Sequence, residues 1–293
     1  MPAAGRRFFQ YSVLKLFPLL PYIRILRPLN AALTFASVIV AAVLSEKISQ
    51  INWLTVCFGA LAAAVIAAAG NVHNDILDLE VDKINRPERP LPRGDISPRA
   101  ASNLSGLLFL TGIIIGFFLG QIPALITLTA SLMLMAYNHR LKMIPLLGNI
   151  TVSLLTALAF IFGAVLAGNP AGGIIPAVFA LLFHFSREVV KDMADITGDQ
   201  ARPGQTYAGK YGLTAAAKLA RLTLIALIII VPLPYFAKLY QIAYLIICLI
   251  GVEIPLVWAL FRLKNLQKEN LSLISKVLKA GMVMGLAALG VGR

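Results

Sequence analysis

Charge is scarce in this sequence, and negative charge is the scarcer kind. The 293 residues include 13 Asp and Glu against 26 Lys and Arg, and charged residues make up 13% of the chain, whereas soluble domains have about 25%. The two cysteines, Cys57 and Cys248, both fall inside apolar runs, which argues against a disulfide framework. Hydrophobic residues make up 59% of the chain, and the mean hydropathy is +0.82. These values exclude an ordinary soluble domain.

Long apolar runs predict an all-α polytopic membrane protein with nine transmembrane helices. Each run is close to the ~20 residues that a helix needs to cross a bilayer, and the runs are too continuous for a membrane β-barrel. The expected spans are 29–45, 52–73, 101–120, 121–138, 146–167, 172–191, 213–233, 237–260 and 272–291.

The positions of Lys and Arg predict the orientation in the cell membrane. With the N-terminus in the cytoplasm, 23 of the 26 basic residues lie on the inner side, and Lys47, Lys238 and Arg293 lie outside. This asymmetry accounts for the net charge of +13 without a nucleic-acid partner.

The same pattern predicts one membrane-embedded domain, 1–293, with two parallel halves around a central cavity. Residues 1–27 form a cytoplasmic or interfacial arm, 28–142 the first four-helix half, 143–262 the second half, and 263–293 the ninth span.

A first acidic stretch follows the second span. Asn74, Asp78 and Asp82 are spaced i, i+4, i+8, and Asp75 lies three residues before Asp78. On a helix these steps fall on one face. Carboxylates gathered near a bilayer repel one another and are costly to desolvate, so a cation must compensate them.

A second acidic stretch follows the sixth span on the same predicted side. Asp192, Asp195 and Asp199 are spaced i, i+3, i+7, again on one helical face. A solvated helix end would explain one such stretch as well as a binding site does. Two stretches at matching places in an apolar chain favour a site.

The residue types indicate which cation and which ligand would bind. Oxygen ligands without cysteine or paired histidine favour Mg²⁺ over zinc, and Mg²⁺ held by a few carboxylates usually binds phosphate or diphosphate as well. Basic residues suited to the same anion surround both stretches: Lys83, Arg86, Arg89, Arg93 and Arg99 near the first, and Arg187, Lys191, Arg202 and Lys210 near the second.

These stretches resemble the motifs of a known family. Asn74–Asp82 has the pattern N-D-x-x-D-x-x-x-D and Asp192–Asp199 the pattern D-x-x-D-x-x-x-D, each after the second helix of a half. The pair resembles the UbiA-type intramembrane prenyltransferase superfamily, as do Arg-Pro-Leu-Asn at 27–30 and Tyr-Asn-His-Arg-Leu-Lys at 137–142. Residues 187–199 are most similar to the digeranylgeranylglyceryl phosphate synthase branch, although Thr-Tyr-Ala stands at 206–208 where that branch has Thr-Leu-Pro.

The resemblance implies Mg²⁺-dependent transfer of a polyprenyl group, geranylgeranyl in that branch, from its diphosphate to a lipophilic acceptor. The acceptor of that branch is geranylgeranylglyceryl phosphate, in ether-lipid synthesis. The implied metal ligands are Asn74, Asp78, Asp195 and Asp199. Asp75, Asp82 and Asp192 are candidates to ligate the metal, orient its waters or act as a base.

Basic and polar residues complete the expected site. Candidates for the diphosphate are Arg86, Arg89, Arg93, Lys142 and Arg202, although any one of them could instead only set the membrane topology. Candidates for the acceptor or the cavity wall are Asn30, Arg140, His184 and Arg187.

Other functions remain open at this point. An aromatic acceptor, as in quinone, tocopherol or chlorophyll-type biosynthesis, is the alternative within the family. A cation-coupled transporter is the alternative outside enzymes, but it would place ionisable residues near the bilayer midplane, and here they cluster at span ends.

Overall fold

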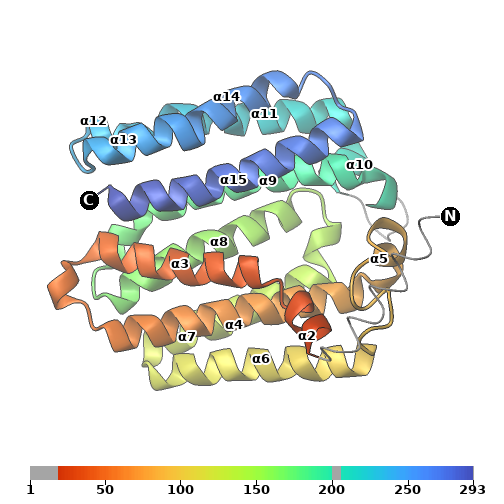
Figure 1. The fold of residues 1–293 in the computed structure, drawn as a ribbon, viewed down its shortest axis with the longest axis horizontal. Coiled ribbons are helices and arrows are strands. Elements are labelled where there is room, and N and C mark those ends of the chain that lie inside the picture. The colour runs from red at the N-terminus through yellow and green to blue at the C-terminus, as the bar shows by residue number, and fades with distance from the viewer. Residues whose placement is uncertain (1–18, 200–205, 293) are drawn as a thin grey trace.

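The structure is a computed structural model that describes residues 19–199 and 206–292, apart from the side chains of residues 85 and 197–199. The described residues include eight long helices, and Figure 1 shows that they run back and forth along one direction. They are α3 (Pro28–Ser45), α4 (Trp53–Leu77), α6 (Pro98–Phe118), α7 (Gln121–His139), α8 (Leu147–Leu166), α9 (Ile174–Asp199), α11 (Leu213–Ile230) and α15 (Lys268–Val291).

The remaining span, the eighth in chain order, is built from three shorter pieces. They are α13 (Ile242–Cys248), the π-helical turn η4 (Leu249–Glu253) and α14 (Ile254–Arg262). The connections contain α2 (Leu20–Ile25), η1 (Ile48–Gln50), α5 (Leu79–Asn85), η2 (Leu141–Met143), η3 (Pro170–Gly173), α10 (Tyr207–Tyr211) and α12 (Leu233–Phe236).

The nine predicted spans are confirmed. Within the described ranges, nine helical stretches are long and apolar enough to cross a membrane, and their limits agree with the sequence-based ones to within a few residues. The eighth span begins at Ile242 rather than near 237, because the chain still turns at Lys238, whose φ is +57°. The sixth span continues as helix α9 to Asp199 and carries the second acidic stretch, as expected.

Local sequence explains where the helices of the first half begin. The side chain of Asn52 caps α4 by accepting a hydrogen bond from the backbone N–H of Thr55 at 3.2 Å. Ser97 caps α6 in the same way, at 3.1 Å from the backbone N–H of Ala100, and Pro98 occupies the first helical position. Helices α4 and α6 are antiparallel and pack along their length, so the two caps lie at opposite ends of the pair.

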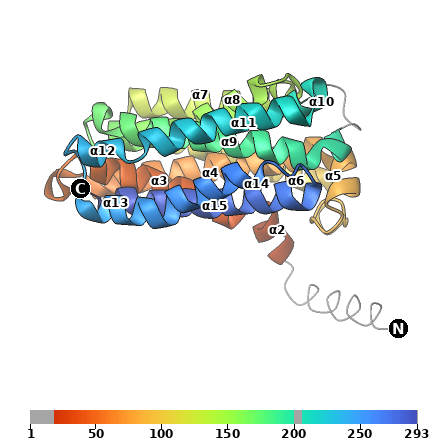
Figure 2. The same ribbon diagram turned by 90° about the horizontal axis from the view of Figure 1, so that it is seen from above.

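Two groups of four spans surround a central cavity, and α15 is the additional helix. The first group is α3, α4, α6 and α7, and the second is α8, α9, α11 and α13–α14. Contacts between α3 and α8 and between α7 and α8 join the groups, while α15 packs on α9, α13 and α3 (Figures 1 and 2). Helices α3 and α15 contact each other, and both line the cavity.

The junction between the two groups depends on a bare backbone contact. A Cβ atom added at Gly163 of α8 would overlap the backbone carbonyl oxygen of Val38 on α3 and approach the Cβ atom of Ala41 to 2.9 Å. Only glycine allows α3 and α8 to come this close, so this contact fixes how the two halves meet.

We expect Gly163→Ala to destabilise the protein by about 2 kcal/mol, because the added methyl group overpacks the junction between α3 and α8. The matched control is Gly106→Ala on α6, where an added Cβ atom meets nothing within 4 Å. Removing a helical glycine there should leave stability unchanged or raise it by up to about 1 kcal/mol. Thermal unfolding of both purified variants in detergent measures the difference, and equal stability of the two would contradict this account of the junction.

Candidate active site

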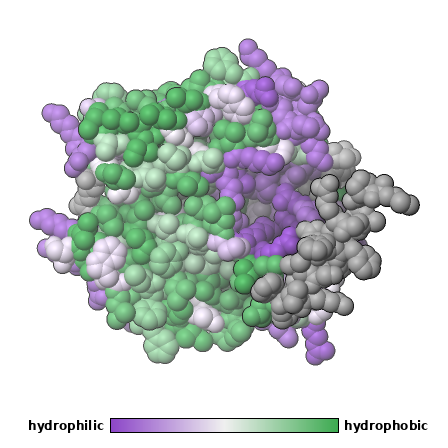
Figure 3. Space-filling view, viewed as in Figure 1, coloured by the Kyte–Doolittle hydropathy of each residue, from purple (hydrophilic) through white to green (hydrophobic). Residues whose placement is uncertain are grey.

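A large cavity and a small polar cleft adjoin each other at the α5 end of the helices. The cavity has a volume of about 800 Å³ and mostly apolar walls, and the cleft has about 100 Å³. Both are lined by Arg27, Asn74, Arg86, Arg89 and Asp195, so the two spaces are continuous. Figure 3 shows a hydrophilic hollow on an otherwise hydrophobic face, between α15 and α2.

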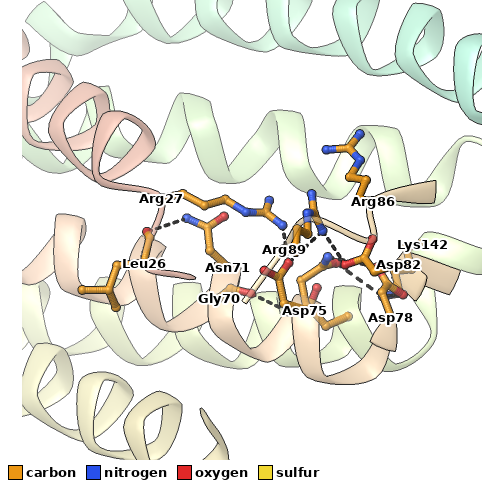
Figure 4. A network of polar contacts seen from close by, with 12 residues as sticks. Leu26, Arg27, Gly70, Asn71, Asp75, Asp78, Asp82, Arg86, Arg89 and Lys142 are labelled. Carbon is orange, nitrogen blue, oxygen red and sulfur yellow. Dashed lines mark hydrogen bonds and ion pairs between the residues drawn. The ribbon is translucent and has the colours of Figure 1, made fainter. Parts of the chain in front are cut away.

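The first acidic stretch is not one continuous helix. Helix α4 ends at Leu77, Asp78 has φ −95° and ψ 10°, and α5 begins at Leu79. The expected single acidic face is therefore divided into two pairs. Asp75 and Asp82 face Arg89, whereas Asp78 faces Lys142 (Figure 4). Asn74 also contacts Lys142.

Two arginines neutralise the more buried pair of carboxylates. Nη1 of Arg89 donates to Oδ1 of Asp75 at 3.0 Å and to Oδ2 of Asp82 at 2.5 Å, and Nη2 of Arg27 donates to the same oxygen of Asp75. The side chains of Asp75 and Asp82 are only 3% and 6% exposed. Burial raises the pKa of Asp82, and the charge of Arg89 opposes that rise. These acids depend on the arginines for their charge balance.

Arg27 reaches Asp75 from an unusual backbone conformation. Its φ of 52° and ψ of 67° lie in the left-handed region, directly between α2 and Pro28 at the start of α3. The side chain of Asn71 holds this turn by donating to the backbone carbonyl of Leu26 at 3.4 Å (Figure 4). The Arg-Pro pair at 27–28 thus directs the guanidinium group of Arg27 into the cleft.

The loop that carries Arg86 and Arg89 borders the cleft, which both side chains line. Leu91 and Ile96 of this loop are buried in an apolar cluster with Ile25 of α2. Arg86 extends from the loop to Asp195 of the second acidic stretch, with 3.5 Å between Nη2 and Oδ2. One loop therefore contacts both acidic stretches.

Lys142 neutralises the other pair. Its ammonium group lies 2.7 Å from Oδ1 of Asp78 and 3.3 Å from Oδ1 of Asn74, and Asn74 donates to Oδ2 of Asp78 at 2.9 Å. Lys142 sits on the 3₁₀ turn η2, which lies tightly over the start of α8. A Cβ atom at Gly148 would be 2.7 Å from the Cα atom of Lys142, so this approach requires glycine.

The second acidic stretch faces the first across the cleft. Asn149 of α8 donates to Oδ2 of Asp192 at 2.8 Å, and Asp195 contacts Arg86. The cleft is lined by residues of both stretches: Asn74, Asp78 and Asp82 from the first, and Asp192 and Asp195 from the second. The side chain of Asp199 and the whole of Arg202 lie outside the described residues.

A third charge cluster lies one turn deeper on α9. Glu188 pairs with Nη1 of Arg187 at 2.6 Å and with Nζ of Lys191 at 2.9 Å, and Nε2 of His184 lies 3.6 Å away. The Glu188 side chain is 8% exposed. This buried carboxylate forms ion pairs with two cations, so neither Arg187 nor Lys191 is an isolated charge on the cavity wall.

The structure places most of the predicted site residues around these two spaces. Arg86, Arg89 and Lys142 line the cleft, and Asn30, His184 and Arg187 line the large cavity. Asp75, Arg93 and Arg140 line neither space: Asp75 lies behind Arg27 and Arg89, with which it pairs, and Arg93 pairs with Asp95 at 3.3 Å. Sequence reasoning gave no site role to four residues that line these spaces: Arg27, Asn149, Glu188 and Lys279.

The cleft suits a hard divalent cation. It is lined by carboxylate and amide oxygens, the donors that Mg²⁺ prefers over sulfur or imidazole. Across the described part of the chain, no three His, Cys, Asp or Glu side chains converge on one point, because the carboxylates are paired with cations and amides. Mg²⁺ needs only one or two protein carboxylates when water and substrate phosphate supply the other ligands. The donor set therefore fits Mg²⁺ bound together with a phosphate-bearing ligand.

Within the described residues, nine spans surround an apolar cavity with acids and cations at its mouth, and this arrangement defines a polytopic membrane protein whose cavity suits an amphiphilic anion. The model of the UbiA prenyltransferase family matches residues 33–279. This chain belongs to that family and is a prenyltransferase.

Relatives of known structure or name support this membership. The chain is 35% identical to digeranylgeranylglyceryl phosphate synthase of Methanothermobacter thermautotrophicus, over 93% of this chain and 95% of the relative. It is 34% identical to the enzyme of the same name in Methanosphaera stadtmanae, over 93% and 98%. A solved structure of a digeranylgeranylglyceryl phosphate synthase matches with a TM-score of 0.74 and 32% identity, over 94% and 98% of the two chains. A UbiA homologue of Archaeoglobus fulgidus, solved with GPP and Mg²⁺, shares the fold with a TM-score of 0.62 and 18% identity, over 92% and 100%.

We expect Arg89→Met to destabilise the protein by about 3 kcal/mol, because it leaves the carboxylate of Asp82 buried without its cation. Adding Asp82→Asn to this variant should restore part of the loss, since the unpaired charge is then removed. Unfolding in detergent of the wild type, both single variants and the double variant gives the coupling energy.

The control for this cycle is Lys83→Met, which breaks an exposed pair with Glu80 on α5. That change should alter stability by less than about 1 kcal/mol. If Arg89→Met were as mild as Lys83→Met, the proposed charge balance of the cleft would be wrong.

Proposed function

We propose that this protein transfers the geranylgeranyl group of geranylgeranyl diphosphate to geranylgeranylglyceryl phosphate, forming an ether bond. The observation that carries this proposal is the similarity of almost the whole chain to enzymes named digeranylgeranylglyceryl phosphate synthase. The cavity supports it, because both substrates combine a long apolar chain with a phosphate-bearing head.

The large cavity offers two apolar walls for two such chains. One wall comes from α4, α7 and α8 and includes Ile66, Leu134 and Leu155. The other comes from α9 and α15 and includes Phe179 and Leu286. Both walls lead to the polar cleft, where the reacting groups of the two substrates would meet.

The reaction breaks the bond between C1 of the prenyl group and the diphosphate oxygen, and the electron pair leaves with the diphosphate. The acceptor hydroxyl then attacks the allylic carbocation and loses its proton. Arg86, Arg89 and Lys142 would donate hydrogen bonds to the departing diphosphate, and the preformed positions of these cations favour its growing charge. Bound Mg²⁺ would neutralise further charge on the same leaving group.

The residues proposed to hold Mg²⁺ are Asn74 and Asp78 on one side and Asp195 and Asp199 on the other. Asp192, held by Asn149, lies on the same cleft and is proposed to accept the acceptor's proton directly or through a water molecule. The loop bordering the cleft keeps bulk water from the carbocation, since Leu91 and Ile96 anchor it.

The same proposal includes an orientation. The cleft lies at the end of the helices that also carries the connections rich in Lys and Arg, which are those after α4, α9 and α14. By the positive-inside tendency, this end faces the cytoplasm. A cytoplasmic site would receive its substrates from the inner leaflet of the cell membrane.

We expect Asp78→Ala and Asp195→Ala each to lower prenyl transfer at least about a hundredfold, because each removes a proposed metal ligand and an electrostatic contact in the cleft. Chelation with EDTA should abolish wild-type activity, and added Mg²⁺ should restore it. Glu80→Ala is the control, because Glu80 belongs to the same stretch but its side chain is 80% exposed. Wild-type activity in either aspartate variant would refute the metal assignment.

The acceptor is tested with labelled geranylgeranyl diphosphate and a panel of acceptors. The wild type should convert geranylgeranylglyceryl phosphate and leave hydroxybenzoate, homogentisate and dihydroxynaphthoate unchanged. Conversion of an aromatic acceptor alone would refute the ether-lipid assignment while preserving the reaction class.

A further inference from the structure

The wall of the large cavity carries more positive than negative charge. Seven cationic side chains and two carboxylates of the described residues line it: Arg27, Arg86, Arg89, Arg187, Lys191, Lys276 and Lys279 against Glu188 and Asp195. Five of these cations form ion pairs with the acids described above. Within the described ranges, Lys276 and Lys279 of α15 form no ion pair.

Lys279 is the less exposed of these two lysines. It lies in the middle of a membrane-spanning helix, is half-buried, and donates to the side-chain oxygen Oδ1 of Asn30 at 2.9 Å. The positive charges of Arg187 and Arg27 act on its ammonium group more strongly than the negative charge of Glu188 does. A lysine inside a span normally pairs with an acid or serves a ligand. Here the positive charges of two arginines outweigh the one carboxylate, and its hydrogen-bond partner is a neutral amide, which is the environment of an anion site.

Arg187 has hydrogen-bonding capacity left for the same anion. Its Nη1 group is used by Glu188, while its Nη2 group makes no hydrogen bond among the residues that the structure describes, and the side chain lines the cavity. Asn30, which the sequence placed on the cavity wall, connects Lys279 to the start of α3, close to Arg27. Together these groups form a cationic corner beside the polar cleft.

The same face of α15 continues as an apolar wall. Met282, Leu286 and Leu289 line the large cavity three, seven and ten residues after Lys279, which is the spacing of one helical face. A ligand with its anionic head at Lys279 would therefore lay an apolar chain along α15. The cations of the cleft, in contrast, belong to the diphosphate of the donor.

We propose that Lys279, together with Arg187 and Asn30, binds the phosphate of the acceptor lipid and so selects a phosphorylated acceptor over an uncharged one. This inference rests on the proposed function, because it specifies where the head of that acceptor binds. It also assigns a role to the ninth span, which carries none of the acidic motif residues. Lys279 is a specificity-determining residue in this scheme and takes no part in breaking the donor's C–O bond.

The test compares Lys279→Met with the wild type in steady-state kinetics. The variant should raise the KM for geranylgeranylglyceryl phosphate about tenfold to a hundredfold, because a charge-assisted contact is lost, and leave the KM for geranylgeranyl diphosphate unchanged. Lys279→Arg, which keeps the charge, should stay within a few-fold of the wild type. Lys268→Met, at the exposed start of the same helix, is the matched control and should behave as the wild type does.

A second variant keeps the proposal testable if Lys279→Met does not fold. Asn30→Asp places a carboxylate next to Lys279, which should neutralise the ammonium group, compete with the phosphate and raise the acceptor KM at least tenfold. An unchanged acceptor KM, or an equal rise in both KM values, in the variant that folds would overturn the proposal. Failure of the wild type to convert the phosphorylated acceptor would instead refute the proposed function itself.

Discussion

Charge compensation beside an apolar cavity is the constraint on which this structure depends. Carboxylates that leave bulk water are stable only when cations or hydrogen-bond donors replace the lost solvation. Asp75 and Asp82 pair with arginine, and Asp78 pairs with Lys142. Asp192 accepts a hydrogen bond from the side-chain amide of Asn149 on α8. The partners come from α2–α3, the loop after α5, η2 and α8, so balancing these charges brings together segments that are distant in the sequence.

This arrangement also prepares the site for its substrate. The cations that hold the acids are the groups that a diphosphate would attract, and the acids are the groups that a divalent metal would attract. When metal and diphosphate bind together, the acids can exchange their cations for the metal and the cations can exchange the acids for the diphosphate. No charge is then left uncompensated. Either one alone would leave unpaired charges of one sign in a partly buried cleft, which is costly. The proposed acceptor corner at Lys279 follows the same rule, since its missing counter-charge is the phosphate of a ligand.

The sequence predicted the nine spans and the acidic motifs, because hydropathy and helical spacing are local properties of the chain. The sequence did not predict which polar and charged side chains contact one another. Arg27 and Asp75 are 48 residues apart and Lys279 and Asn30 are 249 apart, so only packing brings them together. The break of the helix at Asp78 was also missed, and it separates carboxylates that spacing alone placed on one face. Arg93 appeared equivalent to Arg89 in the sequence, but the turn between them directs Arg93 to Asp95.

The apolar anchoring of the loop after α5 has a consequence for how ligands enter the site. Leu91 and Ile96 fix the backbone of the loop, so Arg89 can change partners by rotating its own side chain while the loop stays in place. Such a rotation displaces one side chain, whereas displacement of a lid moves a whole segment and takes microseconds or longer. The cations can therefore rearrange around an incoming head group without opening the loop, so the polar end of the site keeps its bordering loop while lipid chains enter and leave along the helices.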